Sequence, residues 1–178
     1  MTITGWPLTL EQFLALPEAK PALEFGPDGE VSQKMSPTGD HSKLQSEFDQ
    51  RLNNYARPRQ LGRALPELRL NMAGASVVAD IAFYRHARVP GPGHATTPPD
   101  LAIEIASPGQ SREQLADKCR WYVQQGASSA LLVDPEDRTI SAFSPEQEQT
   151  LRGADVLPVH GVLPGLELRV EDIFSALT

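Results

Sequence analysis

The sequence predicts a mixed α/β domain of the α+β type, in which a central mixed sheet is flanked by helices and preceded by an N-terminal hairpin. Three observations support this fold class: consecutive strand-like runs between residues 64 and 84, a strand–helix–strand unit at 101–133, and a long amphipathic helix before both. A chain of 178 residues is about the size of one domain. We therefore expect residues 1–178 to form a single domain.

The N-terminal part predicts a short helix and a hairpin. Thr9 followed by Gln12 is typical of a capping box, and the apolar stripe behind it ends at a proline. The runs 22–25 and 30–35 flank Gly-Pro-Asp-Gly at 26–29, whose residue types suit a tight turn. We expect these two runs to pair as antiparallel strands.

A long amphipathic helix comes next. Its apolar residues recur at steps of four, four and three: Leu44, Phe48, Leu52 and Tyr55. Pro58 ends the pattern because proline cannot continue a helix.

The middle of the chain predicts the central strands. The runs 64–70 and 76–84 are joined by a short connection that contains Gly74, so we expect antiparallel neighbours. A loop rich in Pro, Gly and His follows at 86–99. Residues 101–106 then predict a third strand.

A second long helix is predicted at 111–125, with Gly126 in position for a C-terminal cap. It links the third strand to a buried strand at 130–133, and such a crossover makes the two strands parallel. A turn leads to a further strand at 139–143. The acidic tail ends in a short predicted helix at 170–177.

The composition excludes several classes of protein. With 40% hydrophobic and 22% charged residues, the chain is neither disordered nor fibrous. No apolar stretch approaches the roughly 20 residues that span a bilayer, and the N-terminus lacks a cationic region followed by an apolar one. The single cysteine, Cys119, cannot form an internal disulfide or a cysteine-based zinc site. We expect a cytoplasmic protein without a membrane segment.

The charge is distributed unevenly. A net charge of -7 argues against a protein that coats nucleic acid by bulk electrostatics. However, residues 34–88 carry nine basic against five acidic side chains. This stretch is either a local surface for a polyanion or an ordinary solvated face, and the sequence leaves both open.

Two carboxylates interrupt the apolar pattern of the predicted strands, Asp80 and Glu104. Unpaired carboxylates are rarely buried, because removing an ionised group from water is costly. Strand alternation places Asp80 on the same face as Val78 and Ala82, and on the face opposite Ile81. Small neighbours beside both carboxylates would leave room for an ion and a substrate group.

A lysine interrupts the second long helix in a similar way. Lys118 falls within the apolar stripe of Leu115, Cys119 and Tyr122, so it should face the sheet. Two carboxylates and a lysine match metal-dependent phosphodiester cleavage, in which the carboxylates hold a hard cation and the lysine supports the attacking water. The alternative is a buried ion cluster without chemistry.

These residues belong to a longer pattern that resembles the Uma2 family, formerly a domain of unknown function, over residues 8–172. The residues that carry the resemblance are Glu24 to Gly29, Met35-Ser36-Pro37-Thr38, His41, Asp80, Pro99 to Ile105, Ser107-Pro108, Lys118, Tyr122, Gly126 and Val133-Asp134-Pro135. The family is placed in the restriction-endonuclease-like PD-(D/E)XK superfamily. The resemblance implies a restriction-endonuclease-like sheet with Asp80 and Glu104 on neighbouring strands as metal ligands.

The sequence departs from the superfamily pattern at two positions. Ala79 precedes Asp80 where the superfamily name has proline, and this change touches no catalytic group. Ala106 stands where a lysine is expected two residues after the acidic ligand. Lys118 looks like a lysine that has migrated to the following helix.

Three further residues are auxiliary candidates. His41, at the start of the first long helix, could contact a phosphate or the metal, or could simply cap the helix. Glu24 and Glu47 could each supply an additional ligand, as the resemblance to nucleases implies.

The leading hypothesis is an endonuclease that depends on Mg²⁺ (or Mn²⁺) and hydrolyses DNA phosphodiester bonds. Asp80 and Glu104 would bind the ion, Lys118 would support the nucleophilic water, and the basic stretch would contact the DNA backbone. We expect a homodimer, because two copies can address both strands of a duplex. The alternative is a non-catalytic binding or scaffolding protein that retains the nuclease-like fold, which the net acidity favours.

Overall fold

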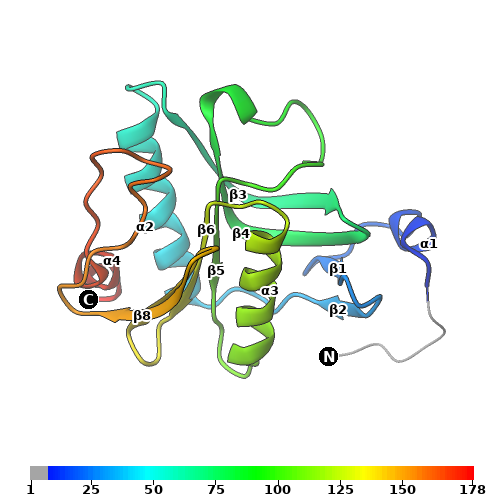
Figure 1. Ribbon diagram of the computed structural model, residues 1–178. Helices are drawn as coiled ribbons and strands as arrows, with labels where there is room; N and C mark the ends of the chain where they lie inside the picture. Colours follow the sequence, from blue (N-terminus) through cyan, green and yellow to red (C-terminus); the bar gives the residue numbers. More distant parts are fainter. Residues whose placement is uncertain (1–7) are drawn as a thin grey trace.

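Two long helices lie on opposite faces of one sheet (Figure 1). The computed structural model describes residues 8–178. Helix α2 spans Gly39–Ala56 and α3 spans Arg112–Gln124. The buried side chains Leu44, Phe48 and Leu52 of α2 pack in one hydrophobic cluster, and those of α3 pack in another. The predicted fold class, a mixed sheet flanked by helices, is confirmed.

The N-terminal elements form as predicted. Helix α1 spans Leu10–Leu14 and begins with the expected capping box, because Thr9 and Gln12 each accept a hydrogen bond from the backbone N–H of the other. Strands β1 (Leu23–Phe25) and β2 (Val31–Gln33) form the antiparallel hairpin.

Within the described residues the sheet has eight strands, in the order β2-β1-β4-β5-β6-β7-β8, with β3 paired to β4. The remaining strands are β3 (Gly62–Met72), β4 (Ala75–Arg85), β5 (Leu101–Ile105), β6 (Ser129–Asp134), β7 (Thr139–Phe143) and β8 (Glu148–Arg152). All strand pairs are antiparallel except β5 and β6, which α3 connects. The predicted parallel crossover is confirmed.

Strand β4 meets two different partners along one edge. Ser76 pairs with Phe25 of β1, and from Ile81 onward the same edge pairs with β5, starting at Ile103. Strand β3 occupies the opposite edge. Between Ser76 and Ile81 this edge of β4 has no partner strand, and we call this gap between β1 and β5 the fork.

The alternation that we predicted for β4 is wrong at Asp80. The ladder between β3 and β4 lacks only the pair of Glu67 and Asp80, and Glu67 has a φ of 50°. A residue in this left-handed region turns the chain locally, so side chains beyond it change face. Ile81 packs in the cluster of α2, whereas Ala79 packs in the cluster of α3.

Several elements outside the centre of the sheet differ from the prediction. Strand β8 was not predicted, because its polar, mostly exposed residues lack an apolar period. The loop after β4 contains a short 3-10 helix, η1 (His86–Arg88). The predicted C-terminal helix is divided into α4 (Val170–Phe174) and the 3-10 helix η2 (Ser175–Leu177), and both contact α2 (Figure 1).

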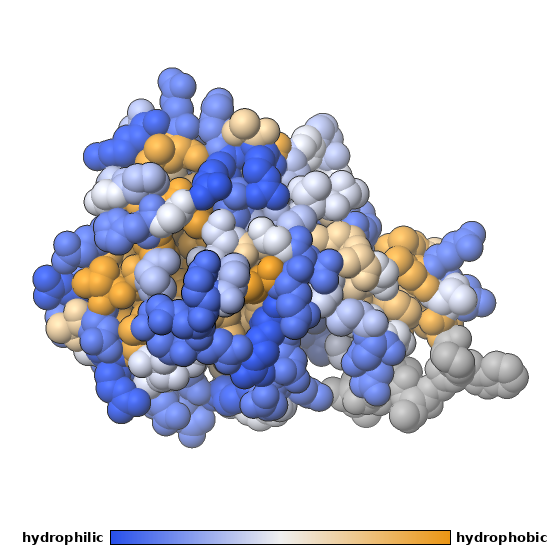
Figure 2. Space-filling model, viewed as in Figure 1, coloured by the Kyte–Doolittle hydropathy of each residue, from blue (hydrophilic) through white to orange (hydrophobic). Residues whose placement is uncertain are grey.

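The surface seen in Figure 2 is hydrophilic over α3, while apolar side chains gather around α1. Leu14 and Leu16 are 48% and 41% exposed there. Between residues 8 and 178, no helix has both the length and the apolar character needed to cross a membrane.

Candidate active site

Charged side chains take the place of a neighbouring strand at the fork. The backbone N–H of Val78 donates to Glu24 at 2.6 Å, and its carbonyl accepts from Lys118 at 3.1 Å and from Lys34 at 3.4 Å. Buried backbone groups need partners, because leaving one unpaired costs about as much as losing a hydrogen bond. The fork thus draws one carboxylate and two ammonium groups into the protein.

Asp80 is at the centre of this arrangement. Its Oδ2 accepts the N–H of Ile105 at 2.7 Å, and its backbone carbonyl accepts from Gln45 of α2 at 2.9 Å. Its Oδ1 lies 2.6 Å from the ammonium of Lys34 and 3.5 Å from Nε2 of His41. Asp80 is 2% exposed, so its carboxylate is buried, and both of its oxygens have partners.

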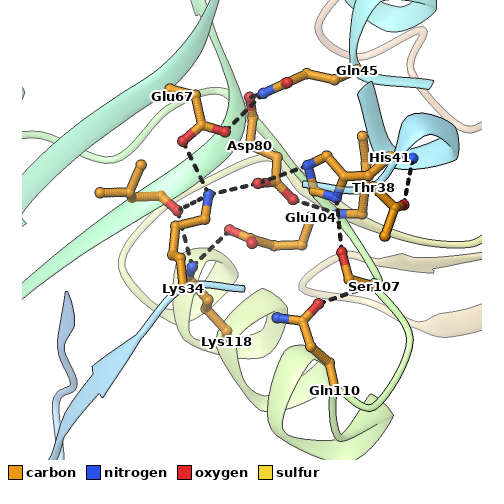
Figure 3. A network of polar contacts seen from close by, with 12 residues as sticks. Lys34, Thr38, His41, Gln45, Glu67, Asp80, Glu104, Ser107, Gln110 and Lys118 are labelled. Atoms are coloured by element: carbon orange, nitrogen blue, oxygen red, sulfur yellow. Dashed lines mark hydrogen bonds and ion pairs between the residues drawn. The ribbon is translucent and has the colours of Figure 1, made fainter. Parts of the chain in front are cut away.

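Glu104 lies on the adjacent strand. The last β4–β5 pair is Ile81 with Ile103, so Asp80 and Glu104 occupy the next position on each strand. Glu104 accepts from the hydroxyl of Tyr122 at 2.8 Å and lies 3.1 Å from Lys118. The structure therefore brings Asp80, Glu104 and Lys118 to one place, as Figure 3 shows.

His41 and Glu67 complete a group of possible metal ligands with Asp80. One ligand atom from each of the three lies within 4.8 Å of the others. The N-terminus of α2 positions His41, because Thr38 caps the helix there, and Nδ1 of His41 lies 3.3 Å from the hydroxyl of Ser107. The expected ligand pair of Asp80 and Glu104 thus has a neighbouring imidazole and a third carboxylate.

The charges in the cluster shift each other's pKa. Burial raises the pKa of Glu104 to about 7, although the ammonium of Lys118 opposes this. Burial alone would raise the pKa of Asp80, but the hydrogen bond from His41 and the charge of Lys34 hold it below its usual range. Burial would lower the pKa of Lys118, yet Glu104 and Glu24 raise it, so Lys118 stays protonated.

The cluster opens into two cavities. One has a volume of about 380 Å³ and is lined by Asp80, Glu104 and Lys118, among others. The second, of about 830 Å³, lies on the side of Glu67 and Arg69. Lys34, Met35 and His41 line both cavities and so stand at the boundary between them.

The structure places five of the six predicted site residues together: Glu24, His41, Asp80, Glu104 and Lys118. It does not bring Glu47 to the cluster. Glu47 lies on α2 and accepts from Arg51 at 2.5 Å, and Arg51 also donates to the carbonyl of Asp172 in α4.

Sequence reasoning missed Lys34, Gln45 and Glu67. Lys34 counted only as part of the basic stretch, and Gln45 lies on a helix position that the apolar period leaves polar. Glu67 did carry a signal, because a proline and a glutamate between apolar residues suggest an irregular edge strand.

The raised pKa of Glu104 predicts how stability depends on pH. The folded protein holds a proton on Glu104 up to about pH 7, whereas the ordinary value is 4.5. The higher affinity of the folded state for this proton stabilises the fold. This stabilisation is complete below pH 4.5 and is lost as the pH rises through 7. Replacing Glu104 by Gln removes this titration. The free energy of unfolding of the variant, minus that of wild type, should therefore rise by about 1 to 3 kcal/mol between pH 5 and pH 8.

Urea unfolding of wild type and Glu104→Gln at pH 5 and pH 8, in buffer that contains a chelator, measures the two free energies of unfolding. A constant difference in the free energy of unfolding would show that Glu104 ionises at its ordinary pKa.

Comparisons with known proteins identify a family and a similar crystal structure. A profile of the Uma2 family, described as "Putative restriction endonuclease", matches residues 10–171. The structure is similar to the crystal structure of "a putative nuclease belonging to DUF820" from Anabaena variabilis ATCC 29413. The TM-score is 0.90 and the identity 33%, over 97% of this chain and 100% of that chain.

A second similarity is distant. Part of a "DrdV-DNA complex" aligns with a TM-score of 0.44 and 18% identity, over 77% of this chain and 12% of that chain, and supports no functional comparison. A search of curated proteins gave no match. Because the family profile spans nearly the whole chain, the protein belongs to the Uma2 family and has its nuclease-like fold.

Proposed function

We propose that the protein is a metal-dependent endonuclease that hydrolyses DNA phosphodiester bonds. One observation carries the proposal: the carboxylates of Asp80 and Glu104 are buried on neighbouring strands, the ammonium of Lys118 contacts Glu104, and all three residues line one cavity. Membership of a family described as "Putative restriction endonuclease", and similarity to the crystal structure of "a putative nuclease belonging to DUF820", support a nuclease.

The donor atoms fit a divalent cation. Asp80 is shared by two sets of possible ligands, one with Glu104 and one with His41 and Glu67. Carboxylate oxygens suit Mg²⁺ and Mn²⁺, and an imidazole nitrogen favours the softer Mn²⁺. Such an ion, when bound, polarises the phosphoryl group and lowers the pKa of water.

The protein's own residues would then act as follows. Lys118 stays protonated, so it stabilises negative charge that develops on the phosphate and does not act as a base. Glu24 holds Lys118 at 2.8 Å and fixes its direction. Glu104, whose pKa is about 7, ionises in the physiological range, and a nearby cation favours its ionised form.

The substrate would approach through the mouth of the cavities. Most cations of the basic stretch have internal partners: Lys34 bonds Asp80, Arg51 bonds Glu47, Arg69 bonds Leu23 and Ser76, and Arg85 and Arg88 pair with Asp100. These internal pairs leave fewer charges of the basic stretch for contact with the DNA backbone than the sequence suggests. A homodimer, which we still propose, would supply two sites for the two strands of a duplex.

Metal binding should depend on Asp80. Calorimetric titration with Mn²⁺ should give one site in wild type and none in Asp80→Asn, which keeps the shape of the side chain and removes its charge. Glu47→Gln is the matched control, because this carboxylate lies outside the cluster, and it should bind Mn²⁺ as wild type does. Equal binding by wild type and Asp80→Asn would place the metal elsewhere.

Lys118→Ala should reduce cleavage far more than stability. Removing a preorganised donor typically lowers the rate about a hundredfold or more. Loss of its ion pairs should cost about 1 to 3 kcal/mol of folding stability, and less when a divalent ion neutralises the carboxylates. Plasmid cleavage and melting temperature, each with and without Mg²⁺, test this.

Equal cleavage by both proteins would remove the catalytic role of Lys118. No cleavage by wild type with any divalent metal or nucleic acid would instead favour the scaffolding protein.

A further inference from the structure

Lys34 has the most unusual position of the lysines in the cluster. It directly follows β2, and its backbone N–H bonds the carbonyl of Ala22, which fixes the start of the side chain. The side chain is 13% exposed, although Lys34 follows a strand at the edge of the sheet. Its ammonium therefore reaches inward to the fork of the sheet.

The ammonium of Lys34 is surrounded by oxygens that suit a metal ion. It lies 2.6 Å from Oδ1 of Asp80, 3.4 Å from Oε2 of Glu67 and 3.4 Å from the carbonyl of Val78. Asp80 and Glu67 also belong to the group of possible metal ligands with His41. The lysine thus contacts two of the three residues that could hold a cation there.

An ion and this ammonium compete for the same oxygen. A divalent ion binds a carboxylate oxygen at about 2.0 to 2.6 Å, and the ammonium already lies 2.6 Å from Oδ1 of Asp80. Two cations this close repel strongly, because the cluster is buried and poorly screened. Lys118 is different, because Glu24 and Glu104 hold it and it does not contact Asp80 Oδ1.

We propose that Lys34 is an internal cation that occupies the metal position at Asp80 and withdraws when a divalent ion binds. The inference rests on the proposed metal dependence. The four-carbon stem can move without any change in the backbone, and the two cavities that Lys34 lines give the ammonium a place to go. The exchange keeps the buried carboxylates neutralised in both states.

The exchange predicts a change in the reactivity of one lysine. Acetylation of wild-type protein by an N-hydroxysuccinimide ester, followed over time by peptide mass spectrometry, measures how accessible each amine is. If the ammonium occupies the cluster at least nine-tenths of the time without metal, Mn²⁺ should accelerate labelling of Lys34 about tenfold or more. Lys118, whose exposure is 15% against 13% for Lys34, is the matched control and should stay protected. Lys43, which is 54% exposed, should react equally under both conditions.

Metal affinity gives a second, independent measurement. Lys34→Met removes the competing charge and keeps the length of the stem, so Mn²⁺ should bind about tenfold or more tightly. Lys43→Met removes a cation on the surface and should leave the affinity unchanged.

The outcomes separate this inference from the proposed function. Mn²⁺ binding that depends on Asp80, with Lys34 still protected from acetylation and no gain in affinity in Lys34→Met, would overturn the inference alone. No Mn²⁺ binding by wild type would overturn both.

Discussion

Strand β4 stops pairing with β1 at Ser76 and starts pairing with β5 only at Ile81, and the rest of the site depends on this gap. The backbone groups of Val78, the carbonyl of Asp80 and the N–H of Ile105 all lie where a continuous sheet would have paired them. Side chains of Glu24, Lys34, Gln45, Lys118 and Asp80 itself pair them instead. Because unpaired buried backbone groups are costly, the fork fixes polar side chains inside an otherwise apolar sheet.

The same contacts give the cluster a structural role and, in the proposed function, a chemical one. Each ammonium bonds the carbonyl of Val78 and also neutralises a buried carboxylate, Lys34 at Asp80 and Lys118 at Glu104. Buried ion pairs add little net stability, and perturbed ionisable groups that line a cavity are typical of functional sites, which supports the proposed function. The unequal pKa shifts of Asp80 and Glu104 follow from their surroundings, since Asp80 receives more hydrogen bonds to its ionised form.

Much of the fold could be predicted from the sequence because local patterns encode it. The cap at Thr9, the stripe of α2 and the crossover through α3 all follow from periodicity and turn chemistry. Asp80, Glu104 and Lys118 were found because each breaks an apolar pattern. Lys34 and Gln45 break none, and only the tertiary gap between β1 and β5 brings them inward. The change of face at Asp80 depends on the backbone of Glu67, which a period-two pattern does not describe.

The central claim is that Asp80, at the fork, holds a divalent ion for phosphodiester hydrolysis. The most direct test is a crystal structure of the protein soaked in Mn²⁺, with anomalous scattering recorded near the manganese edge. The account predicts an anomalous peak at about 2.0 to 2.6 Å from a carboxylate oxygen of Asp80, with Glu104, or His41 and Glu67, completing the ligands. Well-ordered, soaked crystals with no peak at Asp80 would contradict it.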